Sequence, residues 1–262
     1  IMLKRLIGVL PIIDEHVVQS ISYKKYLPIG KPEVIAENLD KWQLDEILVV
    51  CLDRTKKKLG PNFKTLEKIA KVGISTPISY LGGIRDSKEA VDLIQIGADR
   101  VALESLFNFQ PKKAYELSDK IGKQAVIRVQ SFNYSNKKFY AYNYLNKVNF
   151  DNSIIDKVIN DSEYFSELLI IDKENEGVPN GFSISALKQF KKYNLQLICF
   201  GGISSGSQVK KLFNYQNVSA VAVGNFLNYK EIANREFIIP GKTEKVRFTS
   251  FGAKTRGAKE WK

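Results

Sequence analysis

The sequence holds few of the residues that bind transition metals or cross-link a chain, with two cysteines and one histidine among 262 residues. Cys51 and Cys199 each lie within an apolar run, so we expect two reduced thiols in the core rather than a disulfide. His16 has no cluster of cysteine or histidine around it, which argues against a zinc site. The sequence therefore predicts no metal site and no bound cofactor.

Long hydrophobic runs are also missing. Hydrophobic residues make up 44% of the chain. No apolar run approaches the roughly 20 residues that a membrane-spanning helix needs. No signal-peptide pattern precedes the first apolar strand. We therefore expect a cytoplasmic protein with no membrane partner.

Negative charge is scarce relative to positive charge, because 28 acidic and 40 basic residues give a net charge of +12. Most lysines are scattered over predicted helix faces and loops, which is typical of a solvated surface. The segment 242–262 has seven basic and two acidic residues and little apolar periodicity. Nucleic-acid binding by this segment stays an alternative, although it lacks the interleaved aromatic and basic residues typical of such binding.

The chain contains an internal repeat. Gly82-Gly83-Ile84 recurs as Gly201-Gly202-Ile203, 119 residues later. Each triplet follows an apolar run and precedes a polar helix pattern and a second apolar run. Two half-chains that each alternate strands with helices predict a parallel sheet built by duplication.

Eight apolar runs predict strands, and helix patterns fill the gaps between them. Continuous apolar strands are typical of a parallel sheet covered on both faces. We therefore predict an α/β fold, a (β/α)8 TIM barrel with a two-fold half-barrel repeat over residues 1–240, and a basic extension over 241–262. The predicted strands are 5–10, 47–52, 77–81, 100–105, 124–131, 167–171, 196–200 and 220–225. The predicted helices are 32–42, 63–72, 87–96, 111–121, 153–160, 184–193 and 208–215.

Glycines at the predicted strand ends indicate an anion site. In such barrels the loops after the strands form the active site, and backbone N–H groups of glycine-rich loops bind phosphate there. The repetition in both halves favours a ligand with two phosphates, whereas tight turns alone would also explain paired glycines. The glycines at strand ends are Gly82, Gly83, Gly177, Gly201, Gly202 and Gly224, the last followed by Asn225.

Over residues 3 to about 227 the chain resembles the cyclase subunit of imidazole glycerol phosphate synthase, the HisF family of histidine biosynthesis. The resemblance is carried by the opening Leu3-Lys-Arg-Leu-Ile-Gly-Val-Leu and by several short motifs in order. These are Asp45-Glu46, Gly82-Gly83-Ile84, Gly97-Ala98-Asp99-Arg100-Val101, Gln124-Ala125-Val126, Glu176-Gly177 and Gly201-Gly202.

The resemblance implies a lost cyclase reaction. The two aspartates that serve the family as general acid and base fall on Pro11 and Ser131, which cannot transfer protons near neutral pH. A family lysine falls on Gln19. A polar Asn-Thr pair after the fourth strand falls on Glu104-Ser105, and a carboxylate there would repel a phosphate.

The opposite face keeps the family's charges. In the family, four charged residues at strand starts gate the passage of ammonia from a docked glutaminase into the barrel. They correspond to Arg5, Glu46, Arg100 and Glu167, with Arg100 in place of a lysine. Asp99 matches an aspartate at the glutaminase interface. Taken singly, such charges would be ordinary solvated caps of the strands.

A chain that lacks the catalytic aspartates but keeps the gate charges resembles the acetamidino-modification branch of the family. That resemblance implies a heterodimer with a HisH-like glutaminase and transfer of ammonia to an ATP-dependent amidotransferase, which makes an acetamidino sugar for lipopolysaccharide or another surface polysaccharide. The alternative is an active cyclase or a related sugar-phosphate isomerase or lyase. It would use displaced acids at strand ends, namely Asp53, Glu104, Asp172 or Glu174.

Two expectations concern the strands themselves. Leu48, Ser79 and Ala102 should point into the lower barrel, where small or apolar side chains suit either an ammonia path or a packed core. Arg128 lies in a strand that should be apolar. By alternation it points outward beneath the helices, so it needs an acidic partner or access to water.

Overall fold

The computed structural model of the chain describes residues 3–150 and 153–228. The extension predicted over 241–262 lies outside these residues. Within them, no helix is long and apolar enough to cross a membrane.

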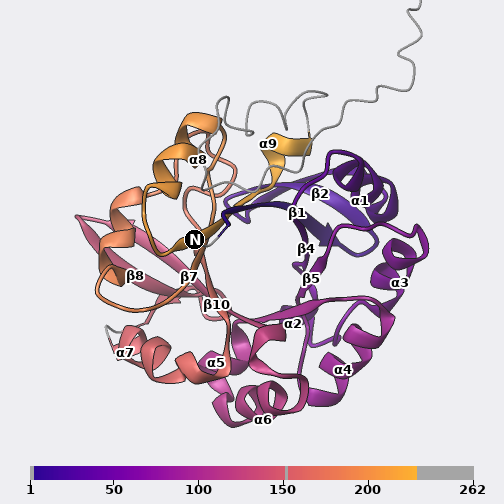
Figure 1. The fold of residues 1–262 in the computed structure, drawn as a ribbon, viewed down its shortest axis with the longest axis horizontal. Helices are drawn as coiled ribbons and strands as arrows, with labels where there is room; N and C mark the ends of the chain where they lie inside the picture. The colour runs from indigo at the N-terminus through magenta and orange to yellow at the C-terminus, as the bar shows by residue number, and fades with distance from the viewer. Residues whose placement is uncertain (1–2, 151–152, 229–262) are drawn as a thin grey trace, which may run out of the picture.

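Eight parallel strands close into a barrel, seen end-on in Figure 1. Each barrel strand pairs with the next barrel strand along the chain. The pairing of the last barrel strand with the first closes the circle. The prediction of a TIM barrel is confirmed. The barrel strands are β1 (Arg5–Ile13), β4 (Glu46–Cys51), β5 (Ile78–Leu81), β6 (Arg100–Leu103), β7 (Val126–Ser135), β10 (Glu167–Asp172), β11 (Leu197–Phe200) and β12 (Val218–Val223).

Helices surround the barrel on the outside (Figure 1). Pro32 and Pro111 begin two of them, where a missing N–H costs nothing. The α-helices are α1 (Pro32–Lys41), α2 (Arg54–Lys57), α3 (Phe63–Lys71), α4 (Ser87–Ile96), α5 (Ser105–Phe109), α6 (Pro111–Ile121), α7 (Ser153–Asn160), α8 (Gly206–Phe213) and α9 (Asn225–Asn228). The short 3-10 helices are η1 (Lys123–Ala125), η2 (Asp161–Tyr164) and η3 (Ile184–Phe190).

The helix pattern at 184–193 forms a 3-10 helix, η3, so the expected regular helix is corrected. Its turns close with three-residue spacing, as in the bond from Ala186 N–H to the Ser183 carbonyl at 2.8 Å. The Ser183 N–H is bound to the Asp172 carboxylate at 2.8 Å, which ties the start of the segment to the end of β10. A short segment tied to a strand end adopts the tighter helix readily.

Two hairpins extend the barrel at its C-terminal end and were not predicted. One consists of β2 (His16–Ile21) and β3 (Lys25–Gly30), antiparallel to each other, with β2 also pairing with β1. The other adds β8 (Lys138–Asn143) to β7, and β9 (Val148–Asn149) to β8.

Inward and outward side chains alternate along the barrel strands, which gives two separate cores. The outer core lies between strands and helices and includes Cys51 and Cys199, both buried and unbridged. The inner core fills the barrel and consists of Ile7, Val9, Leu48, Val50, Ala102, Ile127, Val129, Leu169, Ile171, Ile198, Phe200, Ala220 and Ala222. Leu48 and Ala102 thus point inward as predicted.

The repeated glycine pairs have the same backbone role in both halves. Gly82 and Gly201 have φ values of 126° and 111°. A Cβ on Gly82 would lie 2.3 Å from the Cys51 carbonyl oxygen, and one on Gly201 would lie 2.4 Å from that of Asp172. Each pair lets the chain cross close to the end of the preceding barrel strand, which only glycine permits.

Arg128 is fully buried on the outward face of β7 and has the acidic partner that its position requires. Its guanidinium forms an ion pair with the Asp161 carboxylate and lies over the Phe107 ring, 4.8 Å from the centroid. The Tyr115 hydroxyl donates to the same carboxylate at 2.5 Å. Burial lowers the pKa of Arg128 although Asp161 opposes the shift. The pair therefore offsets the cost of a charge placed beneath the helix layer.

Asp161→Asn should lower the free energy of unfolding by about 3–5 kcal/mol, because it leaves the Arg128 charge buried without a counter-charge. The double variant Arg128→Met/Asp161→Asn should lose less than Asp161→Asn alone. Urea denaturation of the variants measures both values. A double variant that is as unstable as the single one would show that the ion pair is not the dominant contact at this position.

Candidate functional site

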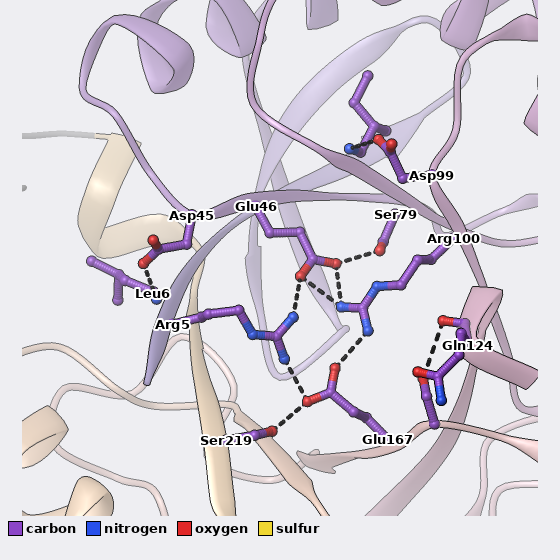
Figure 2. A network of polar contacts seen from close by, with 12 residues as sticks. Arg5, Leu6, Asp45, Glu46, Ser79, Asp99, Arg100, Gln124, Glu167 and Ser219 are labelled. Atoms are coloured by element: carbon purple, nitrogen blue, oxygen red, sulfur yellow. Dashed lines mark hydrogen bonds and ion pairs between the residues drawn. The ribbon is translucent and has the colours of Figure 1, made fainter. Parts of the chain in front are cut away.

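The four charged residues at the strand starts form a closed ring at the N-terminal opening of the barrel (Figure 2). Arg5 donates to Glu46 at 2.9 Å and to Glu167 at 2.5 Å. Arg100 donates to the same two carboxylates, at 2.6 Å and 2.5 Å. Each charge thus contacts two charges of opposite sign, and the ring closes the lower opening.

The two carboxylates of the ring are buried, unlike those of ordinary solvated caps of strands, whereas Arg5 and Arg100 are partly exposed. Glu46 is only 3% exposed and Glu167 8%. The Ser79 hydroxyl donates to Glu46 and the Ser219 hydroxyl to Glu167, so both carboxylates also have uncharged partners (Figure 2). Buried carboxylates with two guanidinium partners and a hydroxyl are well compensated.

Burial and ion pairing act in opposite directions on the ring's pKa values. Burial raises the pKa of Glu167, but Arg5 and Arg100 outweigh it, so this pKa lies below its ordinary value. Burial lowers the pKa of Arg100, but Glu46 and Glu167 outweigh it and the pKa is raised. Glu167 and Arg100 therefore keep their charges at neutral pH.

Asp99 lies beside the ring on the exposed surface (Figure 2). Its carboxylate accepts the backbone N–H of Ile78 at 2.7 Å. The hydrogen bond holds the side chain at the rim of the N-terminal opening.

Above the ring the barrel interior is apolar. The ring residues are the first inward-facing positions of their strands, and the apolar side chains of the inner core occupy the layers above them. Arg100, Ala102 and Glu104 occupy successive inward positions along β6 and its end. A charged layer at the bottom is thus followed by largely apolar layers, up to Glu104 at the top.

A cavity of about 300 Å³ lies at the C-terminal mouth of the barrel. Its floor includes Val50, Ala102 and Ile171, which belong to the inner core. The side chains around it come from β4 to β7, from β10 and from both hairpins. The polar and aromatic lining residues are Ser22, Tyr23, Lys24, Tyr26, Thr55, Lys56, Glu104, Ser105, Ser131, Tyr142, Tyr144, Lys147 and Lys173.

Of the residues that the structure describes, Glu104 is the only acidic one that lines this cavity. It is 7% exposed and accepts the backbone N–H of Ser131 at 2.7 Å. Burial raises the pKa of Glu104 to about 7, although the Ser131 hydrogen bonds and the charge of Arg128 oppose the shift. Glu104 is thus a carboxyl group that can gain or lose a proton near neutral pH.

Only some of the residues predicted to bind an anion line this cavity. Gly82, Gly83 and Ser105 line the cavity. The Gly83 N–H, however, donates a hydrogen bond to the Thr55 hydroxyl oxygen at 2.9 Å. Among the described residues, Gly177, Gly201, Gly202, Gly224 and Asn225 lie outside the lining of this cavity.

The β2–β3 hairpin lies against Gly177 and Asn225 of the second half. The Asn225 amide accepts the Ser20 N–H at 3.3 Å and donates to the Ser20 carbonyl. Glu176 accepts the Ser20 hydroxyl at 2.9 Å and the Tyr23 N–H at 3.2 Å. A Cβ on Gly177 would lie 2.6 Å from the Ser20 carbonyl oxygen. Gly177 and Asn225 therefore hold the hairpin in this structure.

The other candidate acids, Asp53, Asp172 and Glu174, do not line the cavity that contains Glu104. Asp53 pairs with Lys57 at 3.0 Å, and Glu174 pairs with Lys173 at 2.6 Å. Asp172 is buried, and its carboxylate accepts the Asn175 amide at 2.9 Å; burial raises its pKa. Pro11 and Ser131, at the positions of the family aspartates, are both buried and carry no acid.

Sequence reasoning missed the contribution of the hairpins to the cavity. Tyr23, Tyr144 and Lys147 all come from segments that were not assigned any structure. Two-residue turns with left-handed backbone at Ser22-Tyr23 and Asn136-Lys137, flanked by alternating side chains, were the available signal. In the part of the chain that the structure describes, no group of three histidine, cysteine or acidic residues could hold a metal ion.

Glu104→Gln should stabilise the protein at pH 8 by on the order of 2–3 kcal/mol and change little at pH 5. Folding raises the pKa of Glu104 from 4.5 to about 7, so the cost of burying its charge is absent below pH 4.5 and complete above pH 7. Glutamine keeps an acceptor for Ser131. Urea denaturation at both pH values, with the exposed Glu67→Gln as control, measures the difference. An equal effect at both pH values would contradict the raised pKa.

The chain matches known proteins over almost its whole described length. The family model for histidine biosynthesis proteins matches residues 5–233. The chain is 28% identical over 232 residues to imidazole glycerol phosphate synthase subunit HisF of Staphylococcus saprophyticus, covering 87% of this chain and 92% of that protein. The same subunit of Staphylococcus aureus and of Staphylococcus epidermidis is 27% identical, with the same coverage. The chain belongs to the histidine biosynthesis protein family and is a HisF-like barrel.

Proposed function

We propose that this chain is a non-cyclase subunit that docks a HisH-like glutaminase at its N-terminal face and conducts ammonia through the barrel. The observation that carries the proposal is the closed ring of Arg5, Glu46, Arg100 and Glu167, with both carboxylates buried, beneath an apolar interior. A ring of paired charges can open by exchanging partners, and it excludes bulk water while it is closed.

The apolar interior suits ammonia rather than ammonium. The conjugate acid of ammonia has a pKa close to that of an amine such as lysine, so ammonia in water is largely protonated and no longer nucleophilic. The side chains of the inner core between the ring and the upper cavity are apolar, and the inward-facing hydroxyl of Ser79 is engaged with Glu46. Ammonia that enters through the ring would stay neutral until it reaches the C-terminal mouth.

The loss of cyclase chemistry supports a conducting role. Acid–base catalysis across the barrel mouth requires two groups that exchange protons near neutral pH. Pro11 has no titratable group, and Ser131 is engaged through its backbone with Glu104. The proposal therefore assigns nitrogen delivery to this chain and the chemistry of the acceptor to another protein in the cytoplasm.

For that other protein we propose an ATP-dependent amidotransferase that converts an acetamido sugar into an acetamidino sugar for lipopolysaccharide or a related surface polysaccharide. Support comes from the sequence resemblance to the acetamidino-modification branch and from the substitution of both family aspartates. The names of the relatives, which are subunits of a synthase, support a glutaminase partner.

The second candidate is an active sugar-phosphate enzyme of the same barrel family. Glu104 favours it, because a carboxyl with a pKa of about 7 in a cavity can act as a general acid or base. Asp53, Asp172 and Glu174 supply no second group to that cavity. Turnover of a phosphorylated aminosugar or imidazole precursor by the isolated chain would establish this candidate, and its absence would support the first.

The chain mixed with its cognate glutaminase should form a complex by size-exclusion chromatography and raise glutamine hydrolysis above that of the glutaminase alone. Asp99→Asn should weaken the complex about tenfold, because it removes one charge from the docking rim. The asparagine keeps an acceptor for the Ile78 N–H, so the fold is preserved.

Asp119→Asn, an exposed substitution on α6, is the matched control and should leave both measurements unchanged. The absence of both complex and stimulation would refute the proposed function. A complex that forms equally well with Asp99→Asn would refute only the role of Asp99.

A further inference from the structure

The cavity at the C-terminal mouth has a charge pattern that the conducting role does not explain. Four lysines line it, Lys24, Lys56, Lys147 and Lys173, against the single carboxyl of Glu104. The first three are exposed and form no ion pair within the described residues. Lys173 lies 4.5 Å above the Tyr142 ring and pairs with Glu174. The positive groups therefore lie toward the rim.

Glu104 lies at the opposite end of this pattern. It follows Ala102 on the inward face of β6, and Ala102 is part of both the cavity floor and the inner core. Tyr23 from one hairpin and Tyr144 from the other lie close enough for the Glu104 charge to raise their pKa values in addition to burial. The cavity is thus bipolar, with an acid at the floor, aromatic walls and lysines at the rim.

We propose that this cavity binds a small bipolar molecule, whose protonated nitrogen group contacts Glu104 and whose anionic group lies among the rim lysines. The aromatic walls suit a flat or ring-shaped body between the two groups. A buried carboxylate is the side chain that recognises an amine or amidine, because it gains a charge-assisted hydrogen bond that a neutral group cannot provide.

The inference deepens the proposed function, on which its choice of nitrogen group rests. Ammonia that reaches the top of the inner core arrives next to Glu104. A carbon that has accepted this nitrogen carries an amine or amidine, which is basic and protonated at neutral pH. The floor of the cavity is therefore built for a molecule that has received the nitrogen, and its rim for the anionic part of the same molecule.

Titration calorimetry of the full chain with 4-amidinobenzoate tests the proposal, because this probe has an amidinium at one end and a carboxylate at the other. We expect binding with a dissociation constant of about 1 mM or below. Benzamidine, which lacks the anion, and benzoate, which lacks the cation, should each bind more weakly than 4-amidinobenzoate at pH 8.

Glu104→Gln should weaken 4-amidinobenzoate binding at least about tenfold and leave benzoate binding unchanged, since it removes one charge-assisted contact. Lys56→Ala should weaken 4-amidinobenzoate and benzoate, but not benzamidine. Glu67→Gln, an exposed substitution on α3, is the matched control and should bind all three probes like the original chain.

Three results would overturn the proposal: no binding of 4-amidinobenzoate, equal binding by Glu104→Gln, or binding of benzoate as tight as that of 4-amidinobenzoate. Thermal melting of each variant excludes loss of folding as the cause. The probes need no glutaminase, so a failure here leaves glutaminase docking and stimulation intact. Conversely, a failure to stimulate the glutaminase would refute the proposed function and leave the binding of the probes unaffected.

Discussion

The alternation of side chains along the barrel strands is the constraint on which the rest of the structure depends. Every second residue of a parallel barrel strand points to the axis, so β6 places Arg100 in the bottom layer, Ala102 in the middle and Glu104 at the top. A shift of one residue in this strand would turn all three outward. One strand register thus determines the ring, the apolar interior and the acid of the upper cavity.

The buried charges of this barrel differ in whether a charge of opposite sign lies in contact with them. The ring consists of two arginines and two glutamates that pair with one another, and Arg128 pairs with Asp161, so each of these charges contacts a charge of opposite sign. Glu104 has only hydrogen bonds from Ser131 and a more distant arginine to oppose its burial. Its pKa therefore rises, and it is the carboxyl of the upper cavity that titrates near neutral pH.

The eight barrel strands and most helices could be predicted because apolar runs and helix periodicity are local signals. The hairpins could not be assigned with the same ease, because Ser22-Tyr23 and Asn136-Lys137 are turns without glycine at the left-handed positions. The glycine pairs were recognised as a repeat, but their backbone role depends on the carbonyls of Cys51 and Asp172, distant in sequence. The doubled anion site inferred from the strand-end glycines stays a prediction, and the hairpin contacts Asn225 and Glu176 on its second half.

The sequence by itself determined the barrel, its duplicated halves and the outward direction of Arg128, since each follows from periodicity within one strand or between two copies of a motif. Only the tertiary structure decided that Asp161 is the partner of Arg128, that the four ring charges touch, and that Glu104 titrates near neutral pH. The physical reason is that burial and ion pairing depend on groups brought together from different strands. Sequence spacing does not record those distances.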